Sequence, residues 1–279
     1  MKIKQILQES SKILRENKID EHILKAKILL ANKLQKTKEY LIIHENEEIS
    51  EQLENEYKKN ISELINGKPL QYITNNQEFM KMQFYVDENV LIPRADTEIL
   101  VEEVIRLSNQ FKKNNIKILD LCTGSGAIAI SLAKYIQNAI VYASDINEKS
   151  IDIANKNAKN NKVDIQFITS DLFKNINQKF DIIVSNPPYI ATHIIKTLEK
   201  NVQKEPIIAL DGGKDGLKFY KKIAQEANDY LETDGYLCLE IGYDQKKEVL
   251  ELLKKSNYYK EIYSKKDLSR NDRIVIAKK

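Results

Sequence analysis

The sequence predicts an α/β fold, in which a doubly wound, mostly parallel sheet follows a small N-terminal helical bundle. From about Asp96 onward, short apolar runs alternate with helical patterns, and this alternation is typical of a parallel sheet with helices on both faces. Residues 2–66, in contrast, show helical periodicity only. The strand candidates are 117–121, 139–144, 164–168, 180–185, 235–241 and 272–277.

The first 66 residues contain three apolar stripes at helical spacing, which predict a small bundle. Gly67-Lys68-Pro69 ends the last of these helices, because glycine suits the position after a helix and proline cannot continue one. The stripes consist of Ile3, Ile6, Leu7, Ile13 and Leu14, then Ile23, Leu24, Leu29 and Leu30, and then Leu53, Tyr57, Ile61, Leu64 and Ile65.

A short connecting region follows the bundle. Phe79, Met82, Phe84 and Val86 indicate short strands or a hairpin, and residues 91–98 open the next helix. We therefore expect a helical bundle at 1–75, a β-hairpin linker at 76–95 and the α/β domain at 96–279. At 279 residues, with 42% hydrophobic residues, the chain is long enough to bury the cores of two domains.

The first strand of the α/β domain leads into a glycine loop. Residues 117–121 are followed by the loop 122–126 and then by an apolar helical pattern. Glycines allow the backbone to approach a ligand closely, and the loop brings a helix N-terminus against it. The next strand ends in Asp145, which is positioned to accept hydrogen bonds from both hydroxyls of a ribose. A cofactor of the nucleoside type is implied.

The same loop also fits the G-x-G-x-x-G/A pattern of dinucleotide-binding enzymes, so a nicotinamide cofactor must be weighed. Asp120, directly before the loop, is unfavourable beside a pyrophosphate but favourable beside a cationic amino-acid group. S-adenosylmethionine carries such a group. The residues therefore favour a methyl donor over a nicotinamide cofactor.

Asn186, Pro187, Pro188 and Tyr189 follow the apolar run 182–184 and form the most informative segment of the chain. Two consecutive prolines make a stiff backbone, so the Asn186 side-chain carbonyl and the Pro187 backbone carbonyl are preorganised to accept the two hydrogens of an –NH2 group. Tyr189 would then stack on that planar group. The alternative is an ordinary loop at the end of a strand, since Asn-Pro and Pro-Pro are common turn sequences.

The carboxyl ends of parallel strands meet at one edge of a sheet, where ligands bind near the point at which the strand order reverses. The glycine loop, Asp145, the turn 171–173 and the segment 186–189 would all lie at that edge. Asp171 is expected either to cap its own turn or to contact an adenine. Glu240 is expected to hydrogen-bond within the sheet. Arg94 and Glu98 are expected either to form a surface ion pair at the start of a helix or to have a structural role near the cleft.

Composition limits the other functions. The 44 basic residues are nearly matched by 41 acidic ones, so the charge does not demand a nucleic-acid partner, and lysine pairs such as Lys265-Lys266 are expected on solvated faces. The three histidines lack metal-ligand spacing, and we predict no metal site. Without an apolar run of membrane-spanning length or a secretory signal, we expect a cytoplasmic protein without membrane contact, in which Cys122 and Cys238 are free thiols.

These motifs, in this order, resemble the release factor glutamine methyltransferases over nearly the whole chain. The Asn-Pro-Pro-Tyr segment alone is shared with other methyltransferases, whereas the ordered set of motifs is specific to the family. The residues that carry the resemblance are Pro69-Leu70-Gln71-Tyr72-Ile73, residues 92–98, 120–126, 186–190, Glu205-Pro206, residues 209–217 and Glu240-Ile241-Gly242 with Gln245.

The resemblance implies a seven-stranded methyltransferase sheet, S-adenosyl-L-methionine as the cofactor, and methylation of the side-chain amide nitrogen (N5) of the glutamine in the Gly-Gly-Gln motif of peptide chain release factors. It also implies an N-terminal domain that helps to dock the release factor, without a direct need for nucleic acid. We expect a monomer. The sequence departs from the family pattern at Cys122 and Lys81, where glycine is usual, and Lys81 leaves the turn of the hairpin open.

The expected site residues follow from the motifs and the resemblance. The glycine loop and Asp145 would hold the methionine and ribose parts of the cofactor, and Asp171 and Leu172 would border the adenine. Asn186, Pro187 and Tyr189 are the expected catalytic residues, and with Pro188 they would bind the glutamine. The full set expected to bind the cofactor is Asp120, Cys122, Thr123, Gly124, Ser125, Gly126, Asp145, Asp171, Leu172 and Asn186.

Three other functions stay open at this point. A ribosomal-protein glutamine methyltransferase would share the fold and the cofactor, but the Asp96-Thr97-Glu98 sequence differs from that sister group. An adenine-N6 methyltransferase acting on nucleic acid would need a base-flipping pocket and a basic groove, and residues 1–66 show no basic stripe with interleaved aromatics. A catalytically silent binding module is the third, and a methyl-donor binding assay would separate it from an enzyme.

Overall fold

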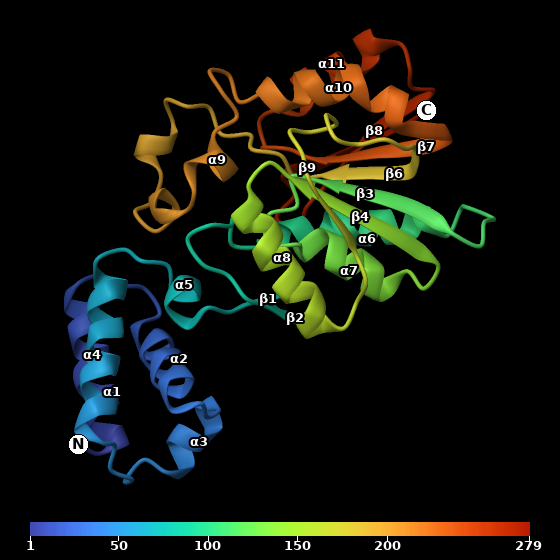
Figure 1. The fold of residues 1–279 in the computed structure, drawn as a ribbon. Helices are drawn as coiled ribbons and strands as arrows, with labels where there is room; N and C mark the ends of the chain where they lie inside the picture. The colour runs from blue at the N-terminus through green and yellow to red at the C-terminus, as the bar shows by residue number, and fades with distance from the viewer. The chain divides into compact units, whose positions relative to one another are not determined.

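The computed structural model describes all residues 1–279 and divides into two compact units. The first unit consists of Met1–Asn76 and Glu199–Lys204, and the second of Gln77–Leu198 and Glu205–Lys279. None of the helices is long and apolar enough to cross a membrane. Figure 1 labels helices and strands of both units.

The first unit is a bundle of short helices around one apolar core. Tyr57 is fully buried there, and its hydroxyl donates to the backbone carbonyl of Ala26 over 3.2 Å. The predicted stripes are largely buried, but Ile13, Ile23 and Leu24 are exposed, which corrects their assignment to the core. The helices are α1 (Ile3–Glu16), α2 (His22–Leu34), α3 (Lys38–Ile43), α4 (Glu51–Ile65) and α5 (Leu70–Thr74), with the short 3-10 turn η3 (Val202–Lys204).

The second unit contains a seven-stranded sheet in the order β5-β4-β3-β6-β7-β9-β8. The pairs among β5, β4, β3, β6 and β7 are parallel, and β9 is antiparallel to both β7 and β8. The strand order reverses between β3 and β6, which defines the place where a ligand is expected. The strands are β3 (Ile116–Leu121), β4 (Ala139–Asp145), β5 (Gln166–Thr169), β6 (Phe180–Ser185), β7 (Leu231–Glu240), β8 (Glu261–Lys266) and β9 (Asp272–Lys278).

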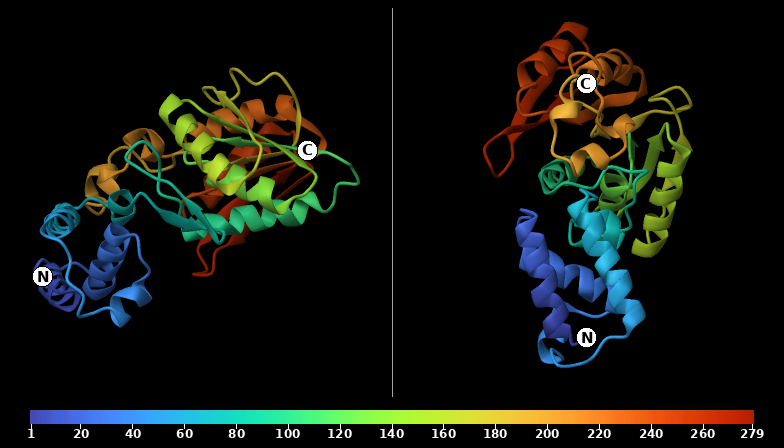
Figure 2. Two further views of the ribbon diagram at one scale, coloured as in Figure 1. Left: turned by 60° about the horizontal axis from the view of Figure 1, so that its bottom comes forward. Right: turned by 90° about the vertical axis from the view of Figure 1, so that its left-hand side faces the viewer.

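Helices cover both faces of this sheet. Alternate strand residues such as Ile118 and Ile182 pack against α6, α7 and α8, whereas Leu119 and Ile183 pack against α10 and α11. Figure 2 shows α6 on one side of the sheet and the orange and red helices α10 and α11 on the other. The helices are α6 (Glu98–Ser108), α7 (Ala127–Tyr135), α8 (Glu148–Asn161), α9 (Ile207–Leu210), α10 (Lys218–Tyr230) and α11 (Lys246–Ser256), with the 3-10 turns η1 (Ala95–Thr97) and η2 (Ile195–Thr197).

The strand β8 was not among the strand candidates. It forms the edge of the sheet and alternates polar with apolar residues only weakly, so the sequence shows little period-two signal there. Lys265 in this strand forms an ion pair with the buried Glu103 of α6 at 2.5 Å, while its own side chain stays 40% exposed, in line with a solvated lysine face.

The predicted hairpin is present as β1 (Gln77–Phe79) and β2 (Met82–Phe84), joined by a two-residue turn. Both turn residues, Met80 (φ 49°) and Lys81 (φ 59°), adopt the left-handed conformation that this turn requires. The turn is held from outside: the backbone N–H of Met80 donates to Glu98, and its carbonyl accepts from Tyr135, each over 2.7 Å. A lysine therefore occupies the usual glycine position.

Candidate active site

The register of the central strands brings the predicted motifs to one edge of the sheet. Leu121 at the end of β3 pairs with Ser144 of β4 and with Ser185 of β6. The residues that follow these three positions, Cys122, Asp145 and Asn186, therefore lie side by side at the carboxyl ends of their strands.

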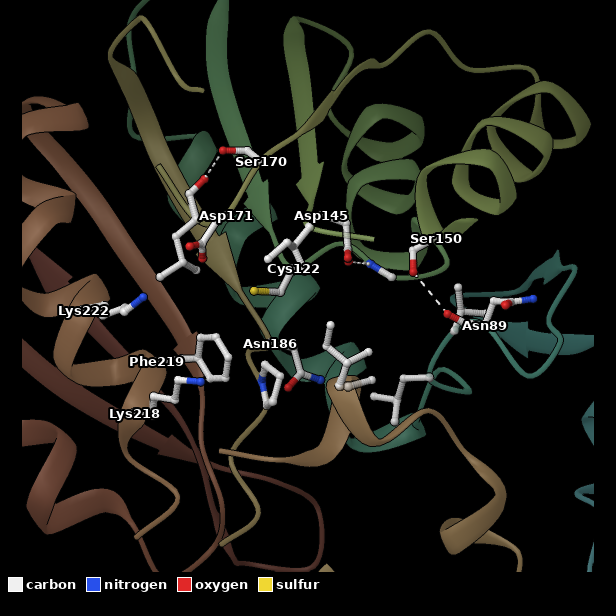
Figure 3. Close-up of a pocket in the computed structure, with 18 residues that line it drawn as sticks. Asn89, Cys122, Asp145, Ser150, Ser170, Asp171, Asn186, Lys218, Phe219 and Lys222 are labelled. Atoms are coloured by element: carbon white, nitrogen blue, oxygen red, sulfur yellow. Dashed lines mark hydrogen bonds between the residues drawn. The ribbon is translucent and has the colours of Figure 1, made fainter. Parts of the chain in front are cut away.

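A cavity of about 270 Å³ opens at this edge. Figure 3 shows the side chains of Cys122, Asp145 and Asn186 around the hollow, with Lys218, Phe219 and Lys222 from α10 on another side. The complete lining is Asn89, Val90, Leu91, Cys122, Gly124, Asp145, Ile146, Ser150, Ser170, Asp171, Leu172, Asn186, Pro188, Ile208, Ala209, Lys218, Phe219 and Lys222.

The glycine loop is shaped by left-handed residues and by one close helix contact. Cys122 (φ 59°) and Gly124 (φ 55°) both have positive φ, so the position where glycine is usual in the resembled family does adopt a conformation that favours glycine. At Gly126 a Cβ would lie 3.0 Å from the side chains of Ala154 and Ile130. Glycine there lets α8 pack directly against the loop.

Asp145 binds the loop and borders the cavity. One of its carboxylate oxygens accepts from the N–H of Gly124 and the other from the N–H of Asn147, each over 2.9 Å. Burial raises the pKa of Asp145, while the hydrogen bonds from Asn147, Gly124 and Ile146 act in the opposite direction. Each oxygen retains a lone pair, so the carboxylate can still accept from a ligand hydroxyl.

Asp120 occupies a different place from the one expected. It is fully buried, lines neither this cavity nor its smaller neighbour, and accepts from the Thr123 hydroxyl (2.6 Å) and the N–H of Ala129 (3.2 Å). Burial raises its pKa to about 7, although both hydrogen bonds oppose this shift. Asp120 thus connects the loop to the start of α7 by hydrogen bonds. Its other oxygen, Oδ1, has no hydrogen-bond partner.

The turn after β5 borders the other end of the cavity. Ser170 organises it: its hydroxyl donates to the carbonyl of Leu172 over 2.7 Å and accepts from the N–H of Asn175 over 3.0 Å. Leu172 has a left-handed backbone (φ 51°), and both Asp171 and Leu172 line the cavity. An apolar wall with a carboxylate at its edge suits a flat heterocycle with an amino group.

A second, smaller cavity of about 50 Å³ shares Leu91, Cys122, Gly124 and Asn186 with the first. Asn186 therefore borders both spaces. Of the other loop residues, Thr123 and Ser125 line only the smaller cavity, and Gly126 lines neither. The complete lining of the smaller cavity is Phe79, Leu91, Pro93, Arg94, Thr97, Cys122, Thr123, Gly124, Ser125, Ala127, Ile128 and Asn186.

The segment from Asn186 to Tyr189 is held rigidly from several sides. Pro187 and Pro188 are buried, and the Asn186 amide nitrogen donates to the hydroxyl of Thr97 over 3.3 Å. The carbonyl of Tyr189 accepts from the Gln245 side chain over 2.8 Å. Pro187 and Tyr189 line neither cavity, and the Tyr189 ring packs partly buried against the α10–α11 side of the core.

The turn 211–216 fits against the same segment. At Gly212 a Cβ would come within 2.8 Å of the Tyr189 backbone, so the residue must be glycine for the two stretches to pack. The N–H of Gly212 donates to the carbonyl of Ile190 over 2.8 Å, and that of Ile190 to the carbonyl of Leu210 over 3.0 Å. These contacts give the turn an architectural role.

Arg94 and Glu98 do not pair with each other, and Arg94 has the structural role near the cleft that was the alternative expectation. Arg94 forms an ion pair with the buried Glu205, which also accepts from the N–H of Ile92 over 3.0 Å. Glu98 binds the hairpin turn instead. A carboxylate more than a hundred positions away in the sequence could not be recognised as the partner from spacing alone.

Sequence reasoning missed the residues that α10 contributes. Lys218 and Lys222 lie one helical turn apart, and with Phe219 they line the larger cavity. The available signal was the position of this helix directly after the turn 211–216. The structure contains no group of three or more His, Cys, Asp or Glu side chains that could hold a metal ion.

Comparison with known proteins agrees with the fold. Residues 96–213 match the methyltransferase small domain, and residues 5–74 match the PrmC N-terminal domain. Among solved structures, a methyltransferase from Pyrococcus furiosus superposes with a TM-score of 0.52 at 19% identity, covering 79% of this chain and 98% of that one. The fold and the site define the class as S-adenosylmethionine-dependent methyltransferases.

Two relatives identify the family within this class. The chain is 41% identical to the release factor glutamine methyltransferase of Fusobacterium nucleatum over 98% of this chain and 78% of that protein. It is 39% identical to that of Clostridium acetobutylicum over 99% of this chain and 98% of that protein. The chain belongs to the release factor glutamine methyltransferase family.

Proposed function

We propose that this chain transfers a methyl group from S-adenosyl-L-methionine to the side-chain amide nitrogen (N5) of the glutamine in the Gly-Gly-Gln motif of peptide chain release factors. The relatives that carry this activity in their names support the proposal. The observation that carries it is the position of Asn186, which borders both the larger cavity and its smaller neighbour. A cofactor in the larger cavity and a substrate amide in the smaller one would both lie next to Asn186.

The residues of the larger cavity fit the proposed cofactor. Asp145 would accept from the ribose hydroxyls, Asp171 and Leu172 would border the adenine, and the loop 122–126 would hold the methionine part. Asp120 would act indirectly, through the shape of the loop. When bound, the cofactor supplies an electrophilic methyl group on a cationic sulfur, and the mostly apolar lining favours loss of that charge during transfer.

The glutamine would be activated by position rather than by a strong base. The lone pair of an amide nitrogen is delocalised into the carbonyl, so the nitrogen is a poor nucleophile. The Asn186 side-chain carbonyl and the Pro187 backbone carbonyl would accept the two amide N–H groups, draw the lone pair out of conjugation and aim it at the methyl group. The surplus proton would leave after transfer. Pro188 would hold this backbone rigid. The Tyr189 ring packs against the core and lines neither cavity, so Tyr189 would anchor the segment in place of the expected stacking on the amide.

The remaining assignments concern the setting of the reaction. We infer that residues 1–75 form the domain that docks the release factor, that 76–95 link it, and that 96–279 carry the chemistry. We further propose a monomer that works in the cytoplasm and needs no direct contact with nucleic acid. These assignments rest on the resemblance and on the match of residues 5–74 to the PrmC N-terminal domain.

A labelling experiment tests the proposed function. The purified chain is incubated with S-adenosylmethionine labelled in the methyl group and with a release factor, and the modified residue is located by peptide mass spectrometry. We expect label on the glutamine of the Gly-Gly-Gln motif and none on a release factor in which that glutamine is alanine. Label on the alanine control, on ribosomal proteins or on DNA in parallel reactions would overturn the assignment.

A further inference from the structure

Glu240 lies directly beside Asn186 at the carboxyl edge of the sheet. In the β6–β7 pair, Ser185 is opposite Leu239, so the next residues along the two parallel strands are Asn186 and Glu240. Glu240 is also the last residue of β7 and pairs with Ile274 of β9 on its other side. The carboxylate of Glu240 therefore lies next to Asn186, which binds the substrate amide in the proposed function.

The environment of Glu240 is unusual for a carboxylate. The residue is only 1% exposed, and its Oε2 has no hydrogen-bond partner. The side chains of Thr97, itself buried, and Asn186 are the hydrogen-bonding groups next to the Glu240 carboxyl group. A charged group in such a place costs free energy unless it serves as an acceptor for neighbours that must donate.

The hydrogen bonds have a direction that Glu240 sets. An ionised carboxylate can only accept, so the Thr97 hydroxyl must donate to it. The Thr97 oxygen is then free to accept, and the Asn186 amide nitrogen donates to it over 3.3 Å. With its NH2 group donating to Thr97 and turned to the Glu240 side, Asn186 presents its carbonyl oxygen on its other side. The two ends of a carboxamide have nearly the same shape, so only these partners decide its orientation.

We propose that Glu240, acting with Thr97, is a positioning residue that fixes the Asn186 carboxamide with its oxygen toward the substrate amide. This inference rests on the proposed function of Asn186. If the carboxamide were reversed, its NH2 group would face the NH2 group of the substrate, and two donors would oppose each other. Neither residue would touch the reacting atoms.

Charged and titratable groups face Glu240 from every neighbouring element. Arg273 on β9 favours its charged form and also pairs with Asp96 (3.1 Å) and Asp267 (3.0 Å). Asp96 disfavours that form, and the phenols of Tyr189 and Tyr220 lie within electrostatic range. Burial is the largest influence and raises the pKa of Glu240 to about 7, so both forms are populated near neutral pH.

The two forms have different consequences for Asn186. Protonated Glu240 can donate to Thr97, which can then donate to the Asn186 oxygen, so the chain of hydrogen bonds can run in reverse. Methyl transfer should therefore be slower when Glu240 is protonated, and kcat should rise with pH through about 7. The glutamine variant Glu240→Gln is uncharged at every pH and should lack this dependence.

The test compares kcat, cofactor Kd and the pH profile of four variants with the wild type, using a release factor as substrate. We expect Glu240→Gln and Thr97→Val to lower kcat at least about tenfold, the equivalent of one hydrogen bond, with an unchanged cofactor Kd. Thr97→Ser keeps the hydroxyl and should retain the wild-type kcat. Glu103→Gln removes another buried carboxylate, which is 3% exposed on α6, and should leave kcat and its pH profile unchanged.

The outcomes separate this inference from the proposed function. If the wild type does not methylate the glutamine, the proposed function fails. If the wild type is active but Glu240→Gln keeps its kcat and its pH profile, the positioning role of Glu240 is wrong while the proposed function stands. A Thr97→Ser variant as impaired as Thr97→Val would also contradict the role, because the hydroxyl alone is meant to carry it.

Discussion

Two buried glutamates of the second unit differ in their hydrogen-bond partners and in their pKa. Glu103 lies on α6, at the flank of the sheet, and Glu240 lies at the carboxyl edge of the sheet. Glu103 on α6 accepts from Arg106 through both oxygens (2.7 and 2.8 Å), from Tyr263 (2.8 Å) and from Lys265 (2.5 Å). Burial would raise its pKa, but these partners outweigh burial and lower the pKa to about 2. Glu240 has an unpartnered oxygen, and its pKa is raised to about 7.

The unpartnered buried atoms extend this comparison. Four buried side-chain atoms lack a hydrogen-bond partner, and three of them, in Asp120, Ser144 and Glu240, lie at or near the ends of β3, β4 and β7. The fourth is the Tyr259 hydroxyl, between α11 and β8. Glu103, in contrast, has partners for both of its oxygens, and this stabilises the fold. The carboxyl edge keeps unused hydrogen-bonding capacity next to the cavity, at a cost in stability. A site that orients a ligand requires this kind of incomplete pairing.

The largest expected effect comes from removing the residue at the junction of the two cavities. Asn186→Ala should lower kcat about 1,000-fold, or about 4 kcal/mol of transition-state stabilisation, because the amide loses both an acceptor and its orientation. The cofactor Kd, measured by calorimetry, should change little, since Asp145 and the loop are intact. Normal turnover by Asn186→Ala would contradict the role of Asn186 in orienting the substrate amide, and with it the functional difference between the carboxyl edge and the flank.

The sequence predicted the residues at the carboxyl edge of the sheet better than the long-range contacts that hold them in place. The strand ends, the glycine loop, Asp145 and the segment 186–189 are local patterns, and parallel strands must bring their ends together. Glu240 and Thr97 are far apart in the sequence and meet only through the register of β6 and β7 and the path of η1. Arg94 paired with Glu205 rather than Glu98 for the same reason.

The missed strand and the exposed isoleucines have a different cause. Periodicity reports burial, and β8 is a half-exposed edge strand whose partner contacts come from β9 and from Glu103. Ile23, at 56% exposure, is apolar without being buried. A pattern of apolar residues therefore predicted the helix at this place but not which of its faces is covered.

The next largest effect tests the flank. Glu103→Gln should lower the free energy of unfolding by about 1–2 kcal/mol at neutral pH, because the depressed pKa of about 2 reflects stabilisation of the charged form, which solvent partly screens at the exposed Arg106 and Lys265. The lowered pKa means that this contribution is present above the unfolded value of 4.5 and is lost as the pH falls toward 2. Denaturant unfolding near neutral pH and in acid measures both.

In that experiment the wild type and Glu103→Gln should converge in stability in acid, where the wild-type carboxylate becomes protonated. A constant difference at every pH would mean that the variant acts through packing and not through charge. Turnover should stay normal under all conditions in which Glu103→Gln is folded, because Glu103 contributes to stability and not to catalysis.

The smallest expected effect compares two left-handed residues, one in the hairpin and one at the cavity. Lys81 and Cys122 both have φ 59°, a conformation that costs a residue with a side chain about 1–2 kcal/mol and that glycine adopts freely. After the larger entropy of glycine in the unfolded chain is deducted, Lys81→Gly and Cys122→Gly should each stabilise the protein by up to about 1 kcal/mol.

The two glycine variants should differ in function, which sharpens the comparison. Lys81 lines neither cavity, so Lys81→Gly should leave the cofactor Kd unchanged, whereas Cys122 lines both, and its removal enlarges the space beside Asn186. The alanine variants Lys81→Ala and Cys122→Ala keep the backbone penalty and serve as matched controls, expected to show no gain in melting temperature. A loss of stability in Cys122→Gly, with a gain in Lys81→Gly, would show that the thiol contributes packing to the loop that outweighs its backbone strain.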